Sequence, residues 1–281
     1  MIRSIIRPAD AMSRRGFLTA AAGLVIAGMA VPTADASPVV VRSSASSARL
    51  PTRAEIVEEF AGRRPRQFGM FLPGMVRHGK ERVALTFDAC GGARGSGYDR
   101  SIIATLRKRN VPATLFLNSR WIAAHPHVAA DLADDPLFEL GNHGWLHRPL
   151  TVAGQSAYGI RGTSSPGEAY DEIVRGLHAV AELTGRAPAW YRPGTAWADD
   201  IGVAIARRLG LRVISFSINA DEGATASKQR VVANLKKARR TDITLGHFNQ
   251  PQGKTAEGFA KELPKMIRAG RHFGTLSRVL A

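Results

Sequence analysis

The chain has 281 residues, 44% of them hydrophobic and 22% charged, which is an ordinary globular balance with enough length for one large core. Its formal net charge of +16 at pH 7 favours anionic partners. Cys90 is the only cysteine, so an intramolecular disulfide is excluded and the fold must be stabilised by its core.

The first 36 residues are typical of an export signal. The stretch SRRGFL (13–18) leads into an apolar run that ends at Val31, and small residues follow up to Ala36. Paired arginines before such a run resemble a twin-arginine signal, the bacterial route for proteins that fold before export. We therefore expect cleavage after Ala36 and a periplasmic or secreted protein. The alternative is a membrane anchor, for which the run is shorter than the about 20 residues that a span needs.

Residues 37–80 are predicted to be a linker and N-terminal extension, with a short helix at 54–64. Loss of residues 1–36 would remove four arginines and two aspartates and lower the net charge by two, to +14. The basic residues are scattered, so we interpret the charge as a property of the surface rather than a nucleic-acid-binding motif. Anionic envelope polymers are the partners that it favours, and no stable membrane span is expected in the mature protein.

From Glu81 onward, short apolar runs alternate with segments of helical spacing. Strands are predicted at 82–88, 112–118, 137–143, 212–218, 242–248 and 273–280, with a further apolar segment at 189–194. Helices are predicted at 98–110, 127–135, 168–185, 199–210, 228–240 and 257–270. This alternation implies parallel strands covered by helices. We therefore expect one α/β domain over 81–281, a distorted, incomplete (β/α) barrel of about seven strands, because a full eight-fold barrel takes about 250 residues.

Two histidines directly follow one predicted strand. The sequence GNHGWLH places His143 and His147 four residues apart. On a helical turn this spacing puts both imidazoles on one face, about 5–6 Å apart at Cβ, which suits joint binding of one transition metal. Paired surface histidines are the alternative, and the position at a strand end beside Asn142 favours the metal site.

Four further polar side chains lie at other strand ends: Asp88, Arg192, Asp221 and His247. Each has a structural explanation when it is taken alone, as a cap, a surface ion pair or a core histidine. Their shared placement at strand ends, where α/β barrels have their active sites, indicates a common catalytic role.

In this order the motifs resemble those of the polysaccharide deacetylase family, the carbohydrate esterases of family four that include the chitooligosaccharide deacetylases. The resemblance covers residues 82–280 and implies a distorted (β/α) barrel. It also implies a role for each residue: Asp88 as catalytic base, His143 and His147 as metal ligands, Arg192 as the partner that orients the base, and Asp221 as the support of the catalytic His247.

These roles are coherent for removal of an N-acetyl group from peptidoglycan, a chitin-like oligomer or an exopolysaccharide. A divalent metal, Zn²⁺ in preference to Co²⁺, would polarise the acetyl carbonyl and lower the pKa of bound water toward about 7. Asp88 would accept the proton of that water, and His247 would protonate the departing amine. Arg192 would keep Asp88 ionised, and Asp221 would hold His247 in its useful tautomer.

The first motif departs from the family pattern, because Ala89 stands where the family has a metal-binding aspartate. Asp88 itself, a water or Cys90 could take that position. We rank Asp88 or water above Cys90, because Gly91-Gly92 predicts a turn, and expect Cys90 to be a buried, inert thiol. Two alternative functions stay open: a glycan-binding protein that has lost catalysis, and a hydrolase of another C–N bond.

Overall fold

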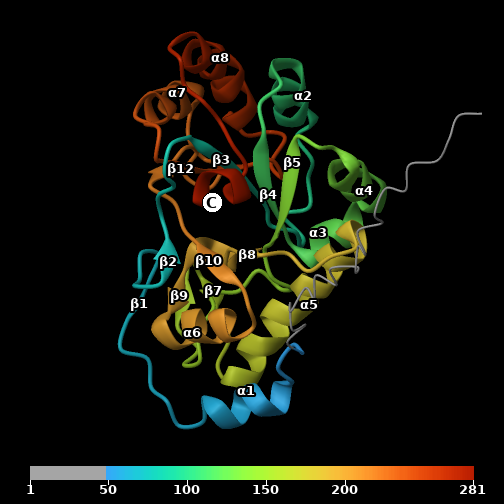
Figure 1. The fold of residues 1–281 in the computed structure, drawn as a ribbon, viewed down its shortest axis with the longest axis vertical. Coiled ribbons are helices and arrows are strands. Elements are labelled where there is room, and N and C mark those ends of the chain that lie inside the picture. The colour runs from blue at the N-terminus through green and yellow to red at the C-terminus, as the bar shows by residue number, and fades with distance from the viewer. Residues whose placement is uncertain (1–48) are drawn as a thin grey trace, which may run out of the picture. The chain divides into compact units, whose positions relative to one another are not determined.

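The computed structural model describes residues 49–281 (Figure 1). The export signal expected over 1–36, its cleavage after Ala36 and the first part of the expected linker lie outside the described residues. Within 49–281, none of the helices combines the length and the hydrophobicity that crossing a membrane requires.

The centre of the fold is an eight-stranded sheet in which every paired strand runs parallel to its neighbour. Strands buried on both faces are typical of a parallel sheet covered by helices, and all residues of β3 and β4 are buried. The strand order is β11 (Ile218–Asn219), β12 (Ile243–His247), β3 (Ala84–Ala89), β4 (Ala113–Leu117), β5 (Phe138–Asn142), β8 (Trp190–Tyr191), β10 (Arg212–Ile214) and β2 (Met75–Val76).

The sheet curls toward a barrel. β10 lies near one end of the strand order and β11 at the other, yet only residues 215–217 join them. An antiparallel bridge between His78, just after β2, and Asp242, just before β12, also connects the two edges. The incomplete (β/α) barrel expected from the sequence is therefore confirmed, with eight strands in place of about seven.

Helices cover the sheet and bury two main apolar clusters. α2 (Arg100–Arg109), α7 (Lys228–Lys236) and α8 (Thr255–Arg268) pack against β3 and β4, and they lie in the upper part of Figure 1. α5 (Pro166–Thr184) and α6 (Asp200–Arg208) build the second cluster with β10. The short helices α3 (Ser119–Ala124) and α4 (Pro126–Asp134) complete the cover beside β5.

The expected domain boundary at Glu81 does not appear as a break in the structure. α1 (Arg53–Glu59) begins at a capping box formed by Thr52 and Glu55, and it packs on α5. β1 (Phe68–Gly69) pairs with β9 (Ala198–Asp199), and β2 adds a strand to the central sheet. From α1 onward the expected extension is part of the domain.

The last predicted strand, over 273–280, is wrong. Within this segment only Phe273 forms a β-bridge, to Val83 just before β3, and the segment then forms α9 (Leu276–Leu280). Thr275 has the extended backbone of an N-cap residue, and Leu276 and Val279 are buried at helical i, i+3 spacing. In so short a segment, helical and strand patterns of apolar residues are difficult to distinguish.

Candidate active site

Asp88 and Arg192 form a buried ion pair at the end of β3. Arg192 Nη1 donates to Asp88 Oδ1 at 2.7 Å, and both side chains are almost fully buried. Arg192 is fixed further by donation to the backbone carbonyls of Ile214 and Ser215 and by the Phe116 ring. Burial alone would raise the pKa of Asp88, but the nearby positive charge of Arg192 outweighs it, and the pKa is lowered. Asp88 is thus held as a carboxylate.

His247 and Asp221 form a second buried pair on the neighbouring strand. His247 lies opposite Asp88 in the β12–β3 register, and its Nδ1 donates to Asp221 Oδ1 at 2.9 Å. Asp221 Oδ2 accepts from the His247 backbone N–H at 2.7 Å and from Thr255 Oγ1 at 2.9 Å. Burial lowers the pKa of His247, but the charge of Asp221 outweighs it and leaves the pKa well above its ordinary value. His247 therefore carries a proton that it can donate.

His143 and His147 meet in a loop, so the helical turn considered in the sequence analysis is wrong. The loop follows β5 and turns at Gly144 (φ 77°) and His147 (φ 60°). The two ring centroids lie 4.9 Å apart at an interplanar angle of 79°. The left-handed backbone at these two positions brings the two imidazole rings together, as a helical turn would also have done.

The ring of His143 is oriented by a backbone carbonyl. Nδ1 lies 2.9 Å from Arg192 O, which can only accept, so Nδ1 carries the hydrogen. In the neutral ring Nε2 then carries no hydrogen, and it lies 3.6 Å from Asp88 Oδ2 and 3.8 Å from Cys90 Sγ. Metal-binding histidines commonly use this arrangement, in which one ring nitrogen donates to a carbonyl and the other is the ligand.

Glu172 holds the histidine loop in place, and the sequence analysis missed it. It is buried on α5 and accepts hydrogen bonds from the backbone N–H groups of Trp145, Leu146 and Arg148 at 2.9–3.3 Å. Gly144 lies directly against the Glu172 carboxylate, where a side chain would overlap it. The available signal was a carboxylate on the apolar face of α5, beside Ala169 and Ile173.

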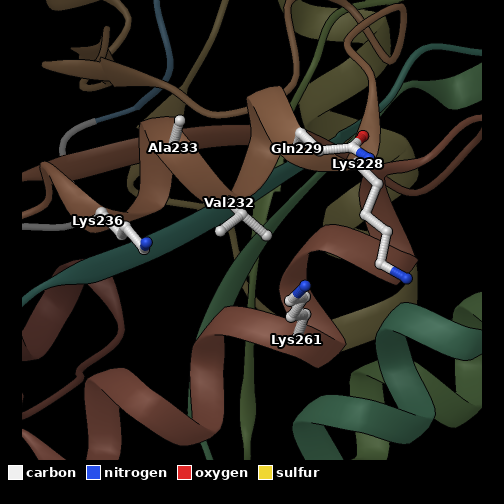
Figure 2. Close-up of a pocket in the computed structure, with 6 residues that line it drawn as sticks. All are labelled: Lys228, Gln229, Val232, Ala233, Lys236 and Lys261. Carbon is white, nitrogen blue, oxygen red and sulfur yellow. The ribbon is translucent and has the colours of Figure 1, made fainter.

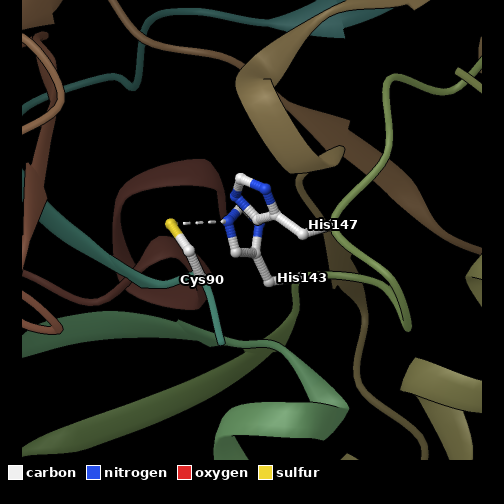
Figure 3. A group of neighbouring side chains, drawn as sticks. All are labelled: Cys90, His143 and His147. Carbon is white, nitrogen blue, oxygen red and sulfur yellow. Dashed lines mark hydrogen bonds between the residues drawn. The ribbon is translucent and has the colours of Figure 1, made fainter. Parts of the chain in front are cut away.

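The Cys90 side chain lies beside the two histidine rings. The donor atoms of Cys90, His143 and His147 all lie within 4.8 Å of one another, which is close enough to hold one metal ion. Figure 3 shows the thiol pointing toward the two imidazole rings. Burial raises the pKa of the thiol, but the charge of His147 and the contacts of the thiol with the neighbouring imidazole rings leave it well below its ordinary value. The expectation of a buried thiol is wrong, because Cys90 is partly exposed and stands in this group; its inertness stays a prediction.

These side chains open into one cavity of about 840 Å³. Asp88, Cys90, His147 and His247 all line it. The hairpin of β6 (Ser156–Ala157) and β7 (Ile160–Arg161) borders the cavity through Tyr158, which is 72% exposed. An exposed aromatic ring beside polar groups suits the stacking of a sugar.

A smaller depression of about 180 Å³ lies between α7 and α8 and is lined by Lys228, Gln229, Val232, Ala233, Lys236 and Lys261 (Figure 2). It shares no residue with the larger cavity, and its lining contains no histidine, cysteine or carboxylate. The larger cavity is thus the one whose lining residues can carry out chemistry.

The comparisons with known proteins agree with this geometry. The model of the polysaccharide deacetylase family matches residues 76–214. A peptidoglycan-N-acetylmuramic acid deacetylase of Bacillus subtilis, PdaA, is 23% identical over 140 residues, which cover 50% of this chain and 48% of that protein. The chain spans about half the length of the curated relatives it matches.

Several solved structures share the fold. BA3943 of Bacillus anthracis, described as a pseudoenzyme of carbohydrate esterase family four, has a TM-score of 0.62 at 23% identity, covering 75% of this chain and 70% of that one. The peptidoglycan N-acetylglucosamine deacetylase Bc1960 has a TM-score of 0.61 at 22% identity, covering 74% and 92%.

Fold and site thus define a curled (β/α) barrel with a hydrolase-type cluster at the carboxyl ends of its strands. The chain belongs to the polysaccharide deacetylase family, as a member that diverges in the first motif.

Proposed function

We propose that this protein is an exported, metal-dependent hydrolase that removes N-acetyl groups from a glycan. The observation that carries the proposal is the pairing of Asp88 with Arg192 beside the pairing of His247 with Asp221, on adjacent strands that border one cavity. One pair holds a base and the other holds an acid, as hydrolysis of an amide requires. The names of two relatives favour peptidoglycan over chitin-like oligomers and exopolysaccharides as the glycan.

The donor set fits a divalent metal. His143 and His147 would hold it, with the Cys90 thiol beside them, and imidazole and thiolate donors suit Zn²⁺, with Co²⁺ as a substitute. When bound, such a metal polarises the acetyl carbonyl and lowers the pKa of a water ligand.

The protein's own residues would move the protons. Asp88 would accept a proton from the attacking water at Oδ2, because Arg192 occupies Oδ1. His247 would donate a proton from Nε2 to the amine as the C–N bond breaks, because Asp221 occupies Nδ1. Arg192 restrains the base, and Asp221 restrains the acid.

Asp88→Asn and, separately, His143→Ala test the proposed function. We expect each to lower acetate release from N-acetylglucosamine oligomers by about 10²–10⁴-fold in the presence of Zn²⁺ or Co²⁺, because one loses the base and the other a ligand. Asp134→Asn, at an exposed carboxylate on α4, is the matched control and should keep full activity. Full activity in either of the first two variants would contradict the mechanism.

A second candidate is a glycan-binding protein without catalysis. It is favoured by Ala89, which removes a carboxylate from the first motif, and by the similarity to a structure described as a pseudoenzyme. Such a protein would bind glycans without stoichiometric metal, so metal analysis of the purified protein separates the two candidates. A substrate panel with other amides would reveal a hydrolase of a different C–N bond.

A further inference from the structure

We propose that Cys90 is the third protein ligand of the metal, so that the centre is a His₂Cys site with a thiolate in place of a carboxylate. The inference rests on the proposed function, because it names the donor set of the same metal site. It goes against the ranking that the sequence alone favoured, in which Asp88 or water filled this position.

The direction of the strand decides which side chains reach the site. Side chains alternate between the two faces along β3, so Asp88 and Cys90 point one way and Ala89 the other. Ala89 is fully buried in the apolar cluster that also contains Phe87 and Leu117. Ala89 does not line the cavity, whereas Cys90 does.

The turn that Gly91-Gly92 predicts begins only after Cys90, so it does not redirect the Cys90 side chain. Gly91 has φ 70°, and a side chain there would overlap the backbone N–H of Trp121. The chain therefore turns sharply after Cys90, and the thiol keeps the orientation that the strand gives it.

The distances match a tetrahedral metal. With Zn–S of about 2.3 Å and Zn–N of about 2.0–2.1 Å, tetrahedral geometry separates a sulfur and a nitrogen ligand by about 3.5 Å. Cys90 Sγ lies 3.8 Å from His143 Nε2, the ring nitrogen that is not hydrogen-bonded to Arg192 O. His143 is fully buried, and its Nε2 points into the space between Cys90 Sγ and Asp88 Oδ2, which lies at 3.6 Å, so a buried ring nitrogen faces the proposed metal position.

Asp88 is the less suitable ligand. Its Oδ1 is paired with the buried guanidinium of Arg192 at 2.7 Å, and a dication sharing this carboxylate would stand close to that fixed positive charge. Asp88 is also outside the group of mutually close donor atoms that Cys90 forms with the two histidines. Cys90 as ligand leaves Asp88 available as the base.

Two measurements test the thiolate without depending on activity. In the Co²⁺-loaded protein we expect a near-ultraviolet thiolate-to-cobalt charge-transfer band, which Cys90→Ser and Cys90→Asp should abolish. Because Cys90 is the only cysteine, its reaction with a thiol-specific disulfide reagent reports on this one site. Zn²⁺ should slow that reaction at least tenfold in the wild type, and it should not do so in His143→Ala.

The outcomes separate the inference from the proposed function. Stoichiometric Co²⁺ without the band, or a thiol that reacts equally fast with and without Zn²⁺, overturns the inference. If such a protein still releases acetate, the proposed function stands alone. If the band and the protection appear but no N-acetylated glycan is hydrolysed, the His₂Cys site stands and the proposed function fails.

Discussion

At the scale of single residues, two ion pairs fix the protonation states of the site. Arg192 lowers the pKa of Asp88 against the effect of burial, and Asp221 raises that of His247 against the same effect. Asp88, the proposed base, is therefore ionised and His247, the proposed acid, is protonated at the same pH, although their strands are adjacent. The protonation state of each residue depends on a partner, Arg192 or Asp221, that does not line the cavity.

Asp221→Asn tests this dependence at the acid. The amide cannot stabilise a charged imidazole, and it permits the wrong tautomer, so we expect kcat to fall by about 10²-fold or more. Circular dichroism should show a retained fold, and Zn²⁺ stoichiometry should be unchanged. A kcat within twofold of the wild type would contradict the role of the pair.

At the scale of elements, the histidine loop depends on α5. Three backbone N–H groups of the loop donate to the Glu172 carboxylate, and Gly194, after β8, lies so close to the His147 backbone that it leaves no space for a side chain. The positions of His143 and His147 are thus set by groups that do not line the cavity.

Glu172→Gln is expected to weaken Zn²⁺ binding by about 10–100-fold, because an amide accepts fewer hydrogen bonds and the loop loses its anchor. Titration against a competing chelator measures the change. Glu182→Gln, an exposed substitution on the same helix, is the control and should leave the affinity unchanged. Equal affinities in the two variants would show that Glu172 does not position the loop.

The β6–β7 hairpin is expected to recognise the sugar chain. Removal of the Tyr158 ring should forfeit an aromatic contact of about 0.5–1.5 kcal/mol. Tyr158→Ala should therefore raise KM for oligomers by about two- to tenfold with kcat unchanged, and Tyr158→Phe should restore most of the loss. A fall in kcat at constant KM would place Tyr158 in the chemistry instead.

Much of this arrangement could be predicted from the sequence, because strand and helix patterns alternate from β3 to α8 and the polar motifs follow strand ends. The structure adds what depends on backbone direction. The sequence ranks Cys90 last because Gly91 predicts a turn, and the pattern does not show in which direction the Cys90 side chain points. Glu172 cannot be distinguished in the sequence from other carboxylates on helices. α9 was mistaken for a strand because a five-residue helix has too few positions to show its period.

At the scale of the whole molecule, curling of the sheet assembles the site. Asp88, His143, Arg192 and His247 come from β3, β5, β8 and β12 or from the residues that follow them, so the site exists only when the barrel is folded. Metal that binds the folded state alone must stabilise it by mass action.

Zn²⁺ should therefore raise the melting temperature of the wild type. At a free concentration 100 times Kd the gain in unfolding free energy is about 2.7 kcal/mol. His147→Ala should show little of this rise in a thermal scan. An equal rise in both proteins would mean that Zn²⁺ binds elsewhere.

We also predict that the N-terminal segment directs export of the protein after it has folded. Replacement of both Arg14 and Arg15 by lysine should block a twin-arginine route. We expect uncleaved protein to accumulate inside the cell, as measured by fractionation and mass spectrometry. Unchanged processing would point to a different export route or to none.

The most direct test of the central claim is acetate release by the purified, Zn²⁺-loaded protein from N-acetylated glycans, peptidoglycan fragments included. We predict one free amine for each acetate released, loss of activity on chelation, recovery on return of Zn²⁺, and no activity in Asp88→Asn. A protein with one bound Zn²⁺ that releases no acetate from any glycan in the panel would contradict the proposed deacetylase.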